Sequence, residues 1–342
     1  FHPALQKNAI GLTRRDYEGA ITTLCDGCGH DSLTAAVIQA FWELSIQPHK
    51  VAKLSGIGCS SKTPAYFLRD AHGFNGVHGR MPALATGANA ANGDIIYVGI
   101  SGDGDSLSIG LGQMSHAIRR NVNLLYLLEN NGVYGLTKGQ FSAAADKGSL
   151  SKKGEGNPLE PIDGALLALT LGATFVARSF SGDKKQLVPL LKAGLMHKGF
   201  AFIDIISPCV TFNDHEGSTK SYAYTREKKV DITYADFVLP TSAITADYDS
   251  GSVQTVQMHD GSIIRLHKLA EDYDPTDRDA AYALVRELQR KGEVATGLLY
   301  VSSDSEDLHA YSGTVPAPLT TLSHEQLCPG NAELQKLQQR FK

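Results

Sequence analysis

The chain has 342 residues, of which 42% are hydrophobic and 20% are charged, as expected for a soluble globular protein with one large α/β domain or two smaller ones. Its formal net charge of −4 indicates no extended basic surface, so binding to nucleic acid is not expected. No apolar run approaches the roughly 18–20 residues of a membrane span, and the N-terminal residues carry no signal-peptide pattern, so we expect a cytoplasmic protein.

The first predicted elements are an arm, a helix and a strand. Residues 1–20 are typical of an N-terminal arm, and a helical pattern then runs from Asp31 to about Pro48. The segment HKVAKLSGIG predicts a strand that enters a glycine turn, and MPALATGANAAN predicts a helix rich in small residues.

The clearest unit in the sequence covers residues 94–131. DIIYVGI is an apolar strand, SGDGDSLSIG a glycine turn, LGQMSHAIRRN a helix and VNLLYLLENN a second apolar strand. This order predicts a right-handed βαβ unit with parallel strands. The stretches 164–180 and 184–209 repeat the order of helix and strand. Residues 21–230 are therefore expected to form a three-layer, doubly wound α/β domain with a mostly parallel sheet.

Residues 231–342 are predicted to be a C-terminal extension. Asp260-Gly261 lies between two alternating segments and is a strong signal for a β-hairpin. Residues 277–292 have the pattern of an amphipathic helix that ends at a glycine, and EVATGLLYVS that of a strand. The remaining residues are polar and rich in turns, and we expect them to form an arm that docks on a partner.

A GDGD run at residues 102–105 follows the first strand of the central unit. Its glycines let the backbone approach a phosphate, and the helix N-terminus after it attracts negative charge. A carboxylate aimed at a phosphate is repulsive unless a cation lies between them, which favours a bridging Mg²⁺ with oxygen ligands. The side-chain oxygen of Asn131 is expected at the same sheet edge, because it follows the next parallel strand. A GDG run alone is more often an ordinary turn, and its pairing with Asn130-Asn131 is the specific signal.

The GDG run followed by Asn-Asn resembles the signature of thiamin diphosphate enzymes. This resemblance implies that Asp103, Asn131 and the main-chain carbonyl of Val133 hold Mg²⁺ on the diphosphate. Thiamin diphosphate is thus the expected cofactor.

The five cysteines leave several interpretations open. Cys25 and Cys28 have the spacing of a redox dithiol, although GAITTL before them is at best a short strand. Cys59 and Cys209 each follow a predicted strand, and the four thiolates together suit zinc or an iron–sulfur cluster equally well by composition. Cys328, in the polar turn LCPG, is expected to be inert.

Five segments narrow the resemblance further. CDGCGH, SGIGCSSKTP, HGRMPALATG, GDGDSLSIG and NNGVYGLTKGQ occur in this order and are similar to the β subunit of 2-oxoacid:ferredoxin oxidoreductases, especially the 2-oxoglutarate type. The resemblance covers about residues 20–240 and is less clear after them. It implies that Cys25, Cys28, Cys59 and Cys209 bind a [4Fe-4S] cluster beside the diphosphate half of the cofactor site.

The same resemblance implies further site residues. Lys62 and Arg80 are candidates to meet a substrate carboxylate, although Lys62 is equally well interpreted as a solvated loop lysine. His78 would otherwise be an ordinary core or surface histidine. The implied cofactor contacts are Ile57, Gly58, Cys59, Ser60, His78, Gly102, Asp103, Gly104, Asp105, Asn131, Tyr134, Gly135, Leu136 and Thr137.

The predicted α/β domain accounts for only half of a thiamin diphosphate site. The pyrimidine half, with the glutamate that activates the cofactor, is expected on a larger α subunit in an α2β2 complex. The resemblance implies oxidative decarboxylation of 2-oxoglutarate with coenzyme A to succinyl-CoA and CO2, with electrons passing from thiamin diphosphate through the cluster to ferredoxin. No general acid or base is expected in this chain.

Three other functions stay open on the sequence. An oxidoreductase for pyruvate or for many 2-oxoacids has similar motifs, since only GDGD, YGLTKGQ and Lys62 favour 2-oxoglutarate. A non-redox thiamin diphosphate decarboxylase or carboligase would leave four cysteines at one sheet edge unexplained. A non-catalytic, metal-binding assembly subunit would leave the pairing of GDG with Asn-Asn unexplained.

Overall fold

An eight-stranded sheet forms the centre of the molecule. The structure is a computed structural model, and it describes residues 6–151, 154–238, 253–257, 263–268, 273–328 and 330–341. The strand order is β2-β1-β3-β4-β8-β7-β13-β9, and every neighbouring pair is parallel except β13 with β7. The strands are β1 Val51–Ser55, β2 His72–Asn75, β3 Ile96–Gly102, β4 Leu124–Asn130, β7 Phe175–Phe180, β8 Phe200–Ile206, β9 Lys229–Asp231 and β13 Val294–Val301.

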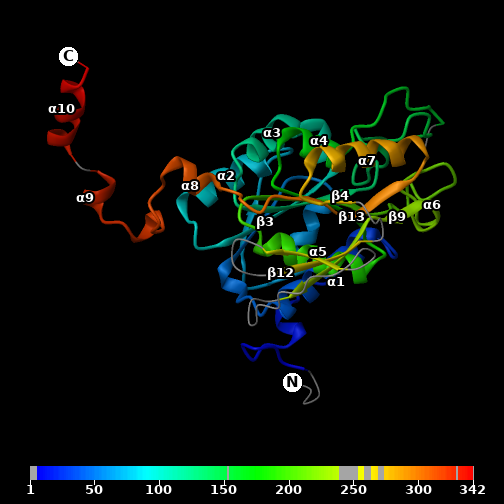
Figure 1. Cartoon of the computed structure of the whole chain (residues 1–342), viewed down its shortest axis with the longest axis horizontal. Coiled ribbons are helices and arrows are strands. Elements are labelled where there is room, and N and C mark those ends of the chain that lie inside the picture. Colours follow the sequence, from blue (N-terminus) through cyan, green and yellow to red (C-terminus); the bar gives the residue numbers. More distant parts are fainter. Residues whose placement is uncertain are drawn as a thin grey trace.

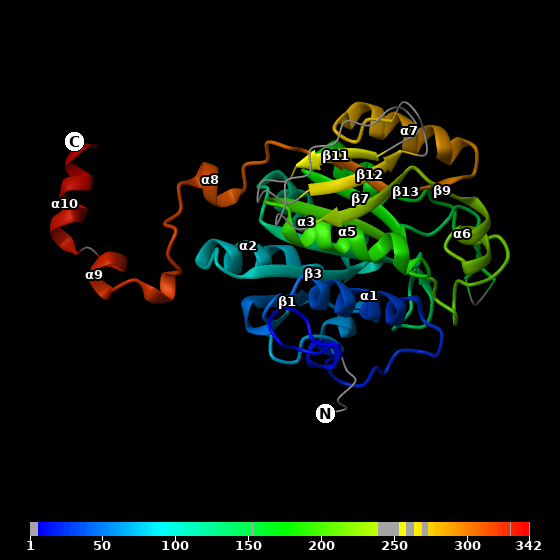
Figure 2. The same cartoon turned by 60° about the horizontal axis from the view of Figure 1, so that its bottom comes forward.

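Helices cover both faces of this sheet, as Figures 1 and 2 show. Helices α1 and α5 share one apolar core with the sheet, and α2, α3, α4 and α7 share the other. The three-layer α/β fold predicted from the sequence is therefore confirmed. The helices are α1 Gly29–Glu43, α2 Met81–Ala91, α3 Leu111–Arg119, α4 Gly164–Leu171, α5 Lys184–Met196, α6 Tyr222–Lys228 and α7 Arg278–Arg290.

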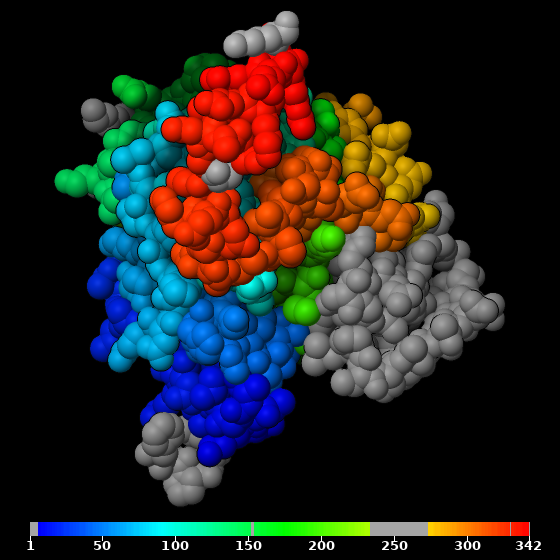
Figure 3. Space-filling model, turned by 90° about the vertical axis from the view of Figure 1, so that its left-hand side faces the viewer, coloured from blue at the N-terminus to red at the C-terminus, as the bar shows by residue number. Residues whose placement is uncertain are grey.

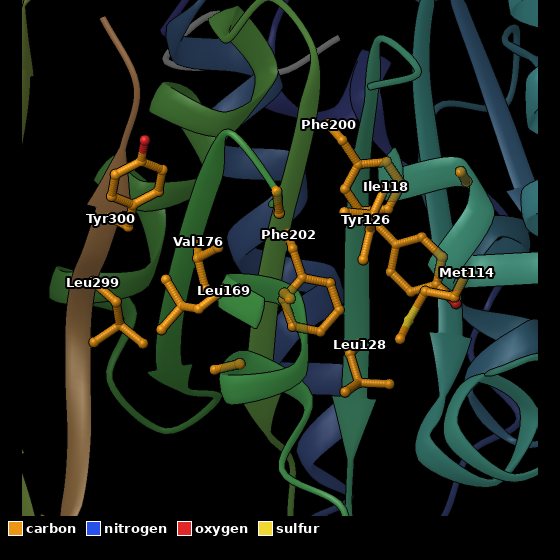
Figure 4. Close-up of a cluster of buried hydrophobic side chains, with 14 of the residues drawn as sticks. Met114, Ile118, Tyr126, Leu128, Leu169, Val176, Phe200, Phe202, Leu299 and Tyr300 are labelled. Atoms are coloured by element: carbon orange, nitrogen blue, oxygen red, sulfur yellow. The ribbon is translucent and has the colours of Figure 1, made fainter. Parts of the chain in front are cut away.

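The central strands are apolar on both sides because both sides are covered. All seven residues of β4 and of β8 are buried. On the side of α3 and α4, Tyr126 stacks between Phe200 and Phe202, with ring centroids 5.7 Å and 5.8 Å away (Figure 4). On the other side, Leu125 and Leu127 of β4 pack with α1 and α5.

The predicted boundary after residue 230 does not follow the sheet. Strand β13 belongs to the predicted C-terminal extension, yet it lies in the main sheet between β7 and β9. Helix α7 packs with it through Ala281, Val285 and Leu288 in the same core as α4. The extension is therefore in part a piece of the α/β domain, because its apolar strand completes the covered sheet.

The predicted hairpin is present as paired strands. β11 (Val253–Gln257) and β12 (Ile263–Lys268) are antiparallel, and β10 (Thr233–Val238) joins β12 to make a three-stranded sheet within the part of the chain that is described. The predicted turn residues Asp260 and Gly261 lie outside the described residues.

The two terminal segments differ in how they meet the body. In the N-terminal segment, Tyr17 is fully buried, and Glu18 forms an isolated antiparallel β-bridge with Phe67 through the main chain. At the other end, α8 (Leu308–Ser312), α9 (His324–Leu327) and α10 (Asn331–Gln339) lead away from the sheet in Figures 1 and 2, and Figure 3 views the molecule from that side. No residue of α9 or α10 is buried. Over the described residues, no helix combines the length and the apolar character that crossing a membrane requires.

Candidate cofactor and cluster site

A cavity of about 100 Å³ lies where β1, β3 and β4 end. These three strands lie side by side with β3 in the middle, and the turns after them supply most of the wall. This sheet edge is where ligands of doubly wound α/β proteins bind. All the cofactor contacts predicted from the sequence line the cavity, together with His30 and Val133; the lining residues are His30, Ile57, Gly58, Cys59, Ser60, His78, Gly102, Asp103, Gly104, Asp105, Asn131, Val133, Tyr134, Gly135, Leu136 and Thr137.

Asp103 and Asn131 meet in the cavity wall. The main-chain N–H of Asn131 donates to Oδ1 of Asp103 over 3.4 Å, and the Ser142 hydroxyl donates to its other oxygen. Burial raises the pKa of Asp103 to about 6, so its carboxylate lacks sufficient compensation for its charge. A divalent cation would supply that compensation. The carboxylate, the Asn131 amide and the nearby Val133 carbonyl are oxygen donors of the type that Mg²⁺ prefers, so these residues fit the ion.

Asp105 occupies the same wall but is engaged by the protein. Its Oδ1 accepts hydrogen bonds from the main-chain N–H groups of Gly79 at 2.7 Å and Ile57 at 3.3 Å, and it also contacts His78 Nδ1. Its Oδ2 accepts from the Ser101 hydroxyl at 2.6 Å. Asp105 therefore fixes the two loops that carry Ile57 and His78, rather than offering a free carboxylate to a ligand.

Two glycines allow close packing at the cavity. A side chain at Gly104 would lie 2.4 Å from the Tyr134 ring, whose hydroxyl donates to the Gly104 carbonyl over 3.1 Å. A Cβ at Gly135 would lie 3.5 Å from Cys59 Sγ and 3.7 Å from Cys209 Sγ. Gly135 thus borders both the cavity and two of the predicted cluster cysteines.

Four of the cysteines come together beside the cavity. Cys28 is buried, Cys59 and Cys209 are half-buried and Cys25 is exposed. Burial raises the pKa of Cys28 to about 12, with a smaller contribution from Cys209, and burial and neighbouring thiols raise the pKa of Cys59 and of Cys209. Each thiol is close enough to another of the four for its charge to matter, and thiolates here need a metal to be stable. The fifth cysteine, Cys328, lies apart from them, between α9 and α10.

Zinc and a [4Fe-4S] cluster place their four thiolates at different distances from one another. Four thiolates around one tetrahedral zinc ion would lie about 3.8 Å apart. Among the described residues, no group of three His, Cys, Asp or Glu side chains is arranged to hold a single metal ion. A [4Fe-4S] cluster binds each thiolate through a different iron atom and requires a wider arrangement. Both groups use cysteine thiolates, so the four side chains suit either zinc or a [4Fe-4S] cluster by ligand type.

Lys62 and Arg80 are not part of the cavity wall. Lys62 lies in a short helical turn, Ser60–Ala65, where its charge lowers the pKa of the Cys59 thiol against the larger effect of burial. Arg80 is exposed and donates to the Gln113 side chain over 3.1 Å. Lys62 is thus near the cluster cysteines, whereas the structure gives Arg80 no contact with the site.

His30 and Glu129 were not predicted as site residues. His30 lines the cavity, is 1% exposed and has a pKa that burial lowers to about 4, so its ring is neutral. Glu129 is fully buried next to Asn130-Asn131, and burial raises its pKa. The sequence carried one signal for Glu129, a single charged residue in the apolar strand VNLLYLLENN.

A larger cavity of about 680 Å³ lies beyond β4, around β7 and β8. Its principal basic residues are already paired: Arg178 contacts Asp163 at 2.5 Å and Asp204 at 2.9 Å, and Lys220 contacts Asp146 at 2.9 Å. The predicted cofactor contacts line the smaller cavity at the strand ends and not this one.

Comparison with known proteins supports the same interpretation of the central domain. Residues 56–205 match the family model described as "Thiamine pyrophosphate enzyme, C-terminal TPP binding domain". This range begins directly after β1, contains β3 and β4, and includes every residue of the cavity wall except His30.

Two curated relatives are similar over the greater part of the chain. The chain is 43% identical over 211 residues to "2-oxoacid:ferredoxin oxidoreductase subunit beta" of Saccharolobus solfataricus, covering 60% of this chain and 68% of that protein. It is 38% identical over 215 residues to "2-oxoglutarate synthase subunit KorB" of Methanocaldococcus jannaschii, covering 62% of this chain and 75% of that protein.

A solved structure matches nearly the entire chain. This is "2-oxoglutarate:ferredoxin oxidoreductase from Magnetococcus marinus with 2-oxoglutarate, coenzyme A and succinyl-CoA bound". The TM-score is 0.74 and the identity 32%, with 95% of this chain and 97% of that chain covered.

Proposed function

Because the chain belongs to the family of 2-oxoacid:ferredoxin oxidoreductase β subunits, we propose that it is the cofactor- and cluster-binding half of a 2-oxoglutarate:ferredoxin oxidoreductase. In the proposed reaction, 2-oxoglutarate loses CO2, its acyl group passes to coenzyme A as succinyl-CoA, and the electrons pass to ferredoxin. The observation that carries the proposal is that the cavity walled by Asp103 and Asn131 adjoins four cysteines, with Cys59 and Gly135 shared by both.

The chain's residues have distinct tasks in this proposal. Asp103, Asn131 and the Val133 carbonyl hold Mg²⁺, and Asp105 keeps the loops of Ile57 and His78 in place. Thiamin diphosphate, when bound, supplies the electron sink for decarboxylation.

The four thiolates of Cys25, Cys28, Cys59 and Cys209 hold a [4Fe-4S] cluster. Gly135 keeps side-chain atoms out of the space between Cys59 and Cys209. No proton transfer is assigned to a side chain of this chain.

The rest of the active site is proposed to come from an α subunit. The described residues form one mostly parallel sheet with its helices. The two smaller sheets, β10-β12-β11 and the pair β5 (Val133–Tyr134) and β6 (Gln140–Phe141), are antiparallel, so the described part contains one α/β unit rather than two. The pyrimidine half and the activating glutamate therefore belong to the partner, in an α2β2 complex.

The choice of 2-oxoglutarate is supported by the names of the similar proteins. The relative from Methanocaldococcus jannaschii is named for 2-oxoglutarate, and the Magnetococcus marinus structure contains 2-oxoglutarate and succinyl-CoA. Lys62, which follows the cavity-lining Ser60 by two residues, is the cation proposed to meet a carboxylate of the substrate.

The test is turnover by the complex co-expressed and purified without oxygen. It is expected to reduce ferredoxin or a viologen dye with 2-oxoglutarate and coenzyme A, and more slowly with pyruvate. Faster turnover of pyruvate would change the substrate assignment. Bound thiamin diphosphate without dye reduction by any 2-oxoacid would favour a non-redox enzyme, and a complex that binds no thiamin diphosphate would favour an assembly subunit.

A further inference from the structure

We propose that Glu129 is a positioning residue for the four cysteines, an inference that rests on the proposed cluster-binding function. Glu129 is fully buried near the end of β4, and three separate segments that carry or adjoin cysteines meet around its carboxyl group. It lines neither cavity and is not a proposed ligand.

Glu129 interrupts an apolar row. Along β4, Leu125 and Leu127 face α1 and α5, and Glu129 is the next residue with the same strand parity. An apolar residue would continue this row without the cost of burying a polar group. A carboxyl group here therefore needs partners that offset that cost.

Its first partner belongs to the segment after Cys59. The hydroxyl of Thr63, which is also fully buried, lies 3.0 Å from Oε1 and 3.2 Å from Oε2 of Glu129. Thr63 lies in the helical turn Ser60–Ala65 that begins directly after Cys59. Glu129 thus ties this turn to the end of β4.

The ring of His30 lies beside Glu129, outside hydrogen-bond distance, and connects the two other segments. His30 Nδ1 lies 3.6 Å from Oε2 of Glu129 and 2.5 Å from the hydroxyl of Ser207. His30 follows Cys28 at the start of α1, and Ser207 precedes Cys209 at the end of β8. The Gly29 N–H also donates to the Pro208 carbonyl over 3.1 Å, so these two segments are packed directly together.

The result is one buried polar group that spans all three cysteine segments. Outer partners of this kind orient the ligands of a metal centre and tune its properties. Glu129 is expected to set the distances between the cysteines and, through them, the reduction potential of the cluster.

The experiment compares Glu129→Leu and Glu129→Gln in the co-purified complex. Three quantities are measured: iron and sulfide content, the rate of iron release to a chelator, and the midpoint potential of the cluster by EPR. Glu129→Leu is expected to release iron about 10-fold faster than wild type and to shift the midpoint potential. Glu129→Gln keeps an acceptor for Thr63 and is expected to stay close to wild type in both.

Two further variants keep the test decisive. Thr63→Val removes one hydroxyl with little change of shape, and it is expected to accelerate iron release less than Glu129→Leu; it carries the test if Glu129→Leu does not fold. Gln186→Leu is the control, since Gln186 is equally buried and bonds Asp231 and Thr296 at the other end of the sheet. It is expected to lower the thermal midpoint while leaving the iron release rate and the potential unchanged.

The outcomes separate this inference from the proposed function. Folded Glu129→Leu or Thr63→Val protein with wild-type iron release and potential would overturn the positioning role, as would equal acceleration in Gln186→Leu. Wild-type complex that contains zinc in place of iron and sulfide would overturn the proposed cluster, and this inference with it.

Discussion

At the scale of single residues, the two aspartates of the GDGD turn differ in what their carboxylates contact. Asp103 has one weak main-chain bond and one hydroxyl partner, whereas Asp105 is held by groups from two loops and from strand β3. Asp103→Asn is therefore expected to weaken Mg²⁺-dependent binding of thiamin diphosphate by at least about 10-fold, because a charged oxygen ligand becomes a neutral amide. Isothermal titration of the cofactor at several Mg²⁺ concentrations measures this.

Asp105→Asn is the matched control for that measurement. Its expected effect is a lower thermal midpoint, since the amide nitrogen cannot accept the hydrogen bond from Ser101. The dependence of cofactor binding on Mg²⁺ is expected to persist. The assignment of the metal to Asp103 is wrong if the two variants exchange these effects.

Gly135 gives a test of the space between the cysteines. An added Cβ would be 3.5 Å and 3.7 Å from the two sulfur atoms, which is ordinary contact for the protein alone. Gly135→Ala is therefore expected to fold with an unchanged thermal midpoint but to lose most of its iron and sulfide, since the methyl group enters the volume that a cluster needs. Alanine at Gly112, where an added Cβ meets nothing within 4 Å, serves as the control and is expected to keep full iron content.

Lys53 gives a prediction about pH. Its ammonium group is buried and donates to the carbonyls of Pro64, Phe67 and Leu68 at 2.7–2.8 Å, and burial lowers its pKa from 10.5 to about 8. The unfolded chain keeps this proton to higher pH, so unfolding takes up a proton between pH 8 and pH 10.5. This group therefore makes the free energy of unfolding rise with pH across that window.

Urea unfolding at pH 7 and pH 9.5 checks the sign for Lys53. The free energy of unfolding at pH 9.5 minus that at pH 7 is expected to be more positive in the wild type than in Lys53→Met, which lacks the amine. Parallel behaviour of the two proteins would show that the pKa of Lys53 is not lowered.

At the scale of elements, a buried ion pair joins β7, β8 and the start of α4. Arg178 of β7 lies between Asp204 of β8 and Asp163, and Asp163 also caps α4 by accepting from the Leu166 N–H. Arg178→Met leaves the buried carboxylate of Asp204 and the half-buried one of Asp163 without their cation, so the free energy of unfolding is expected to fall by about 3–5 kcal/mol. Urea unfolding measures this loss, and adding Asp204→Asn to Arg178→Met is expected to restore part of it.

The elements themselves were predictable where apolar periodicity is strong. The strand–helix–strand unit at residues 94–131 lies where the sequence indicates. Its two strands are covered by helices on both faces, and such strands appear in the sequence as continuous apolar runs. The position of β13 was not predictable in the same way. Its apolar pattern indicates a strand, but pairing beside β7 depends on which sheet edge is free, which is a property of the assembled fold.

The candidate site, too, was predictable from the sequence only in part. The turns after β1, β3 and β4 carry motifs of recognisable spacing, and the residues predicted from them line one cavity. His30 and Glu129 have no motif; they matter because three segments fold onto them. Burial and contact of that kind follow from the tertiary structure and leave only a faint trace in the sequence.

At the scale of the whole molecule, the C-terminal arm is a separable feature. Leu334 and Leu337 of α10 are each 50% exposed, and Phe341 just after the helix is 86% exposed, so an apolar row without a partner in the described chain lies on one side of this helix. We expect it to dock on the partner subunit. Removal of residues 314–342 is expected to leave the thermal midpoint of the β chain unchanged and to weaken its association with the partner, as measured by analytical ultracentrifugation. A large fall in the thermal midpoint would mean that the arm supports the body itself.

The late position of β13 along the chain has a consequence for how the protein is made. Until residues 294–301 have left the ribosome, β7 remains an open edge of a sheet whose other central strands have already been synthesised. An unpaired edge of this kind invites pairing with other chains. Completion of the fold must therefore wait for a segment that follows every proposed ligand along the chain. A message truncated before that segment would yield a chain prone to aggregation even though every proposed ligand of the cofactor and the cluster is present.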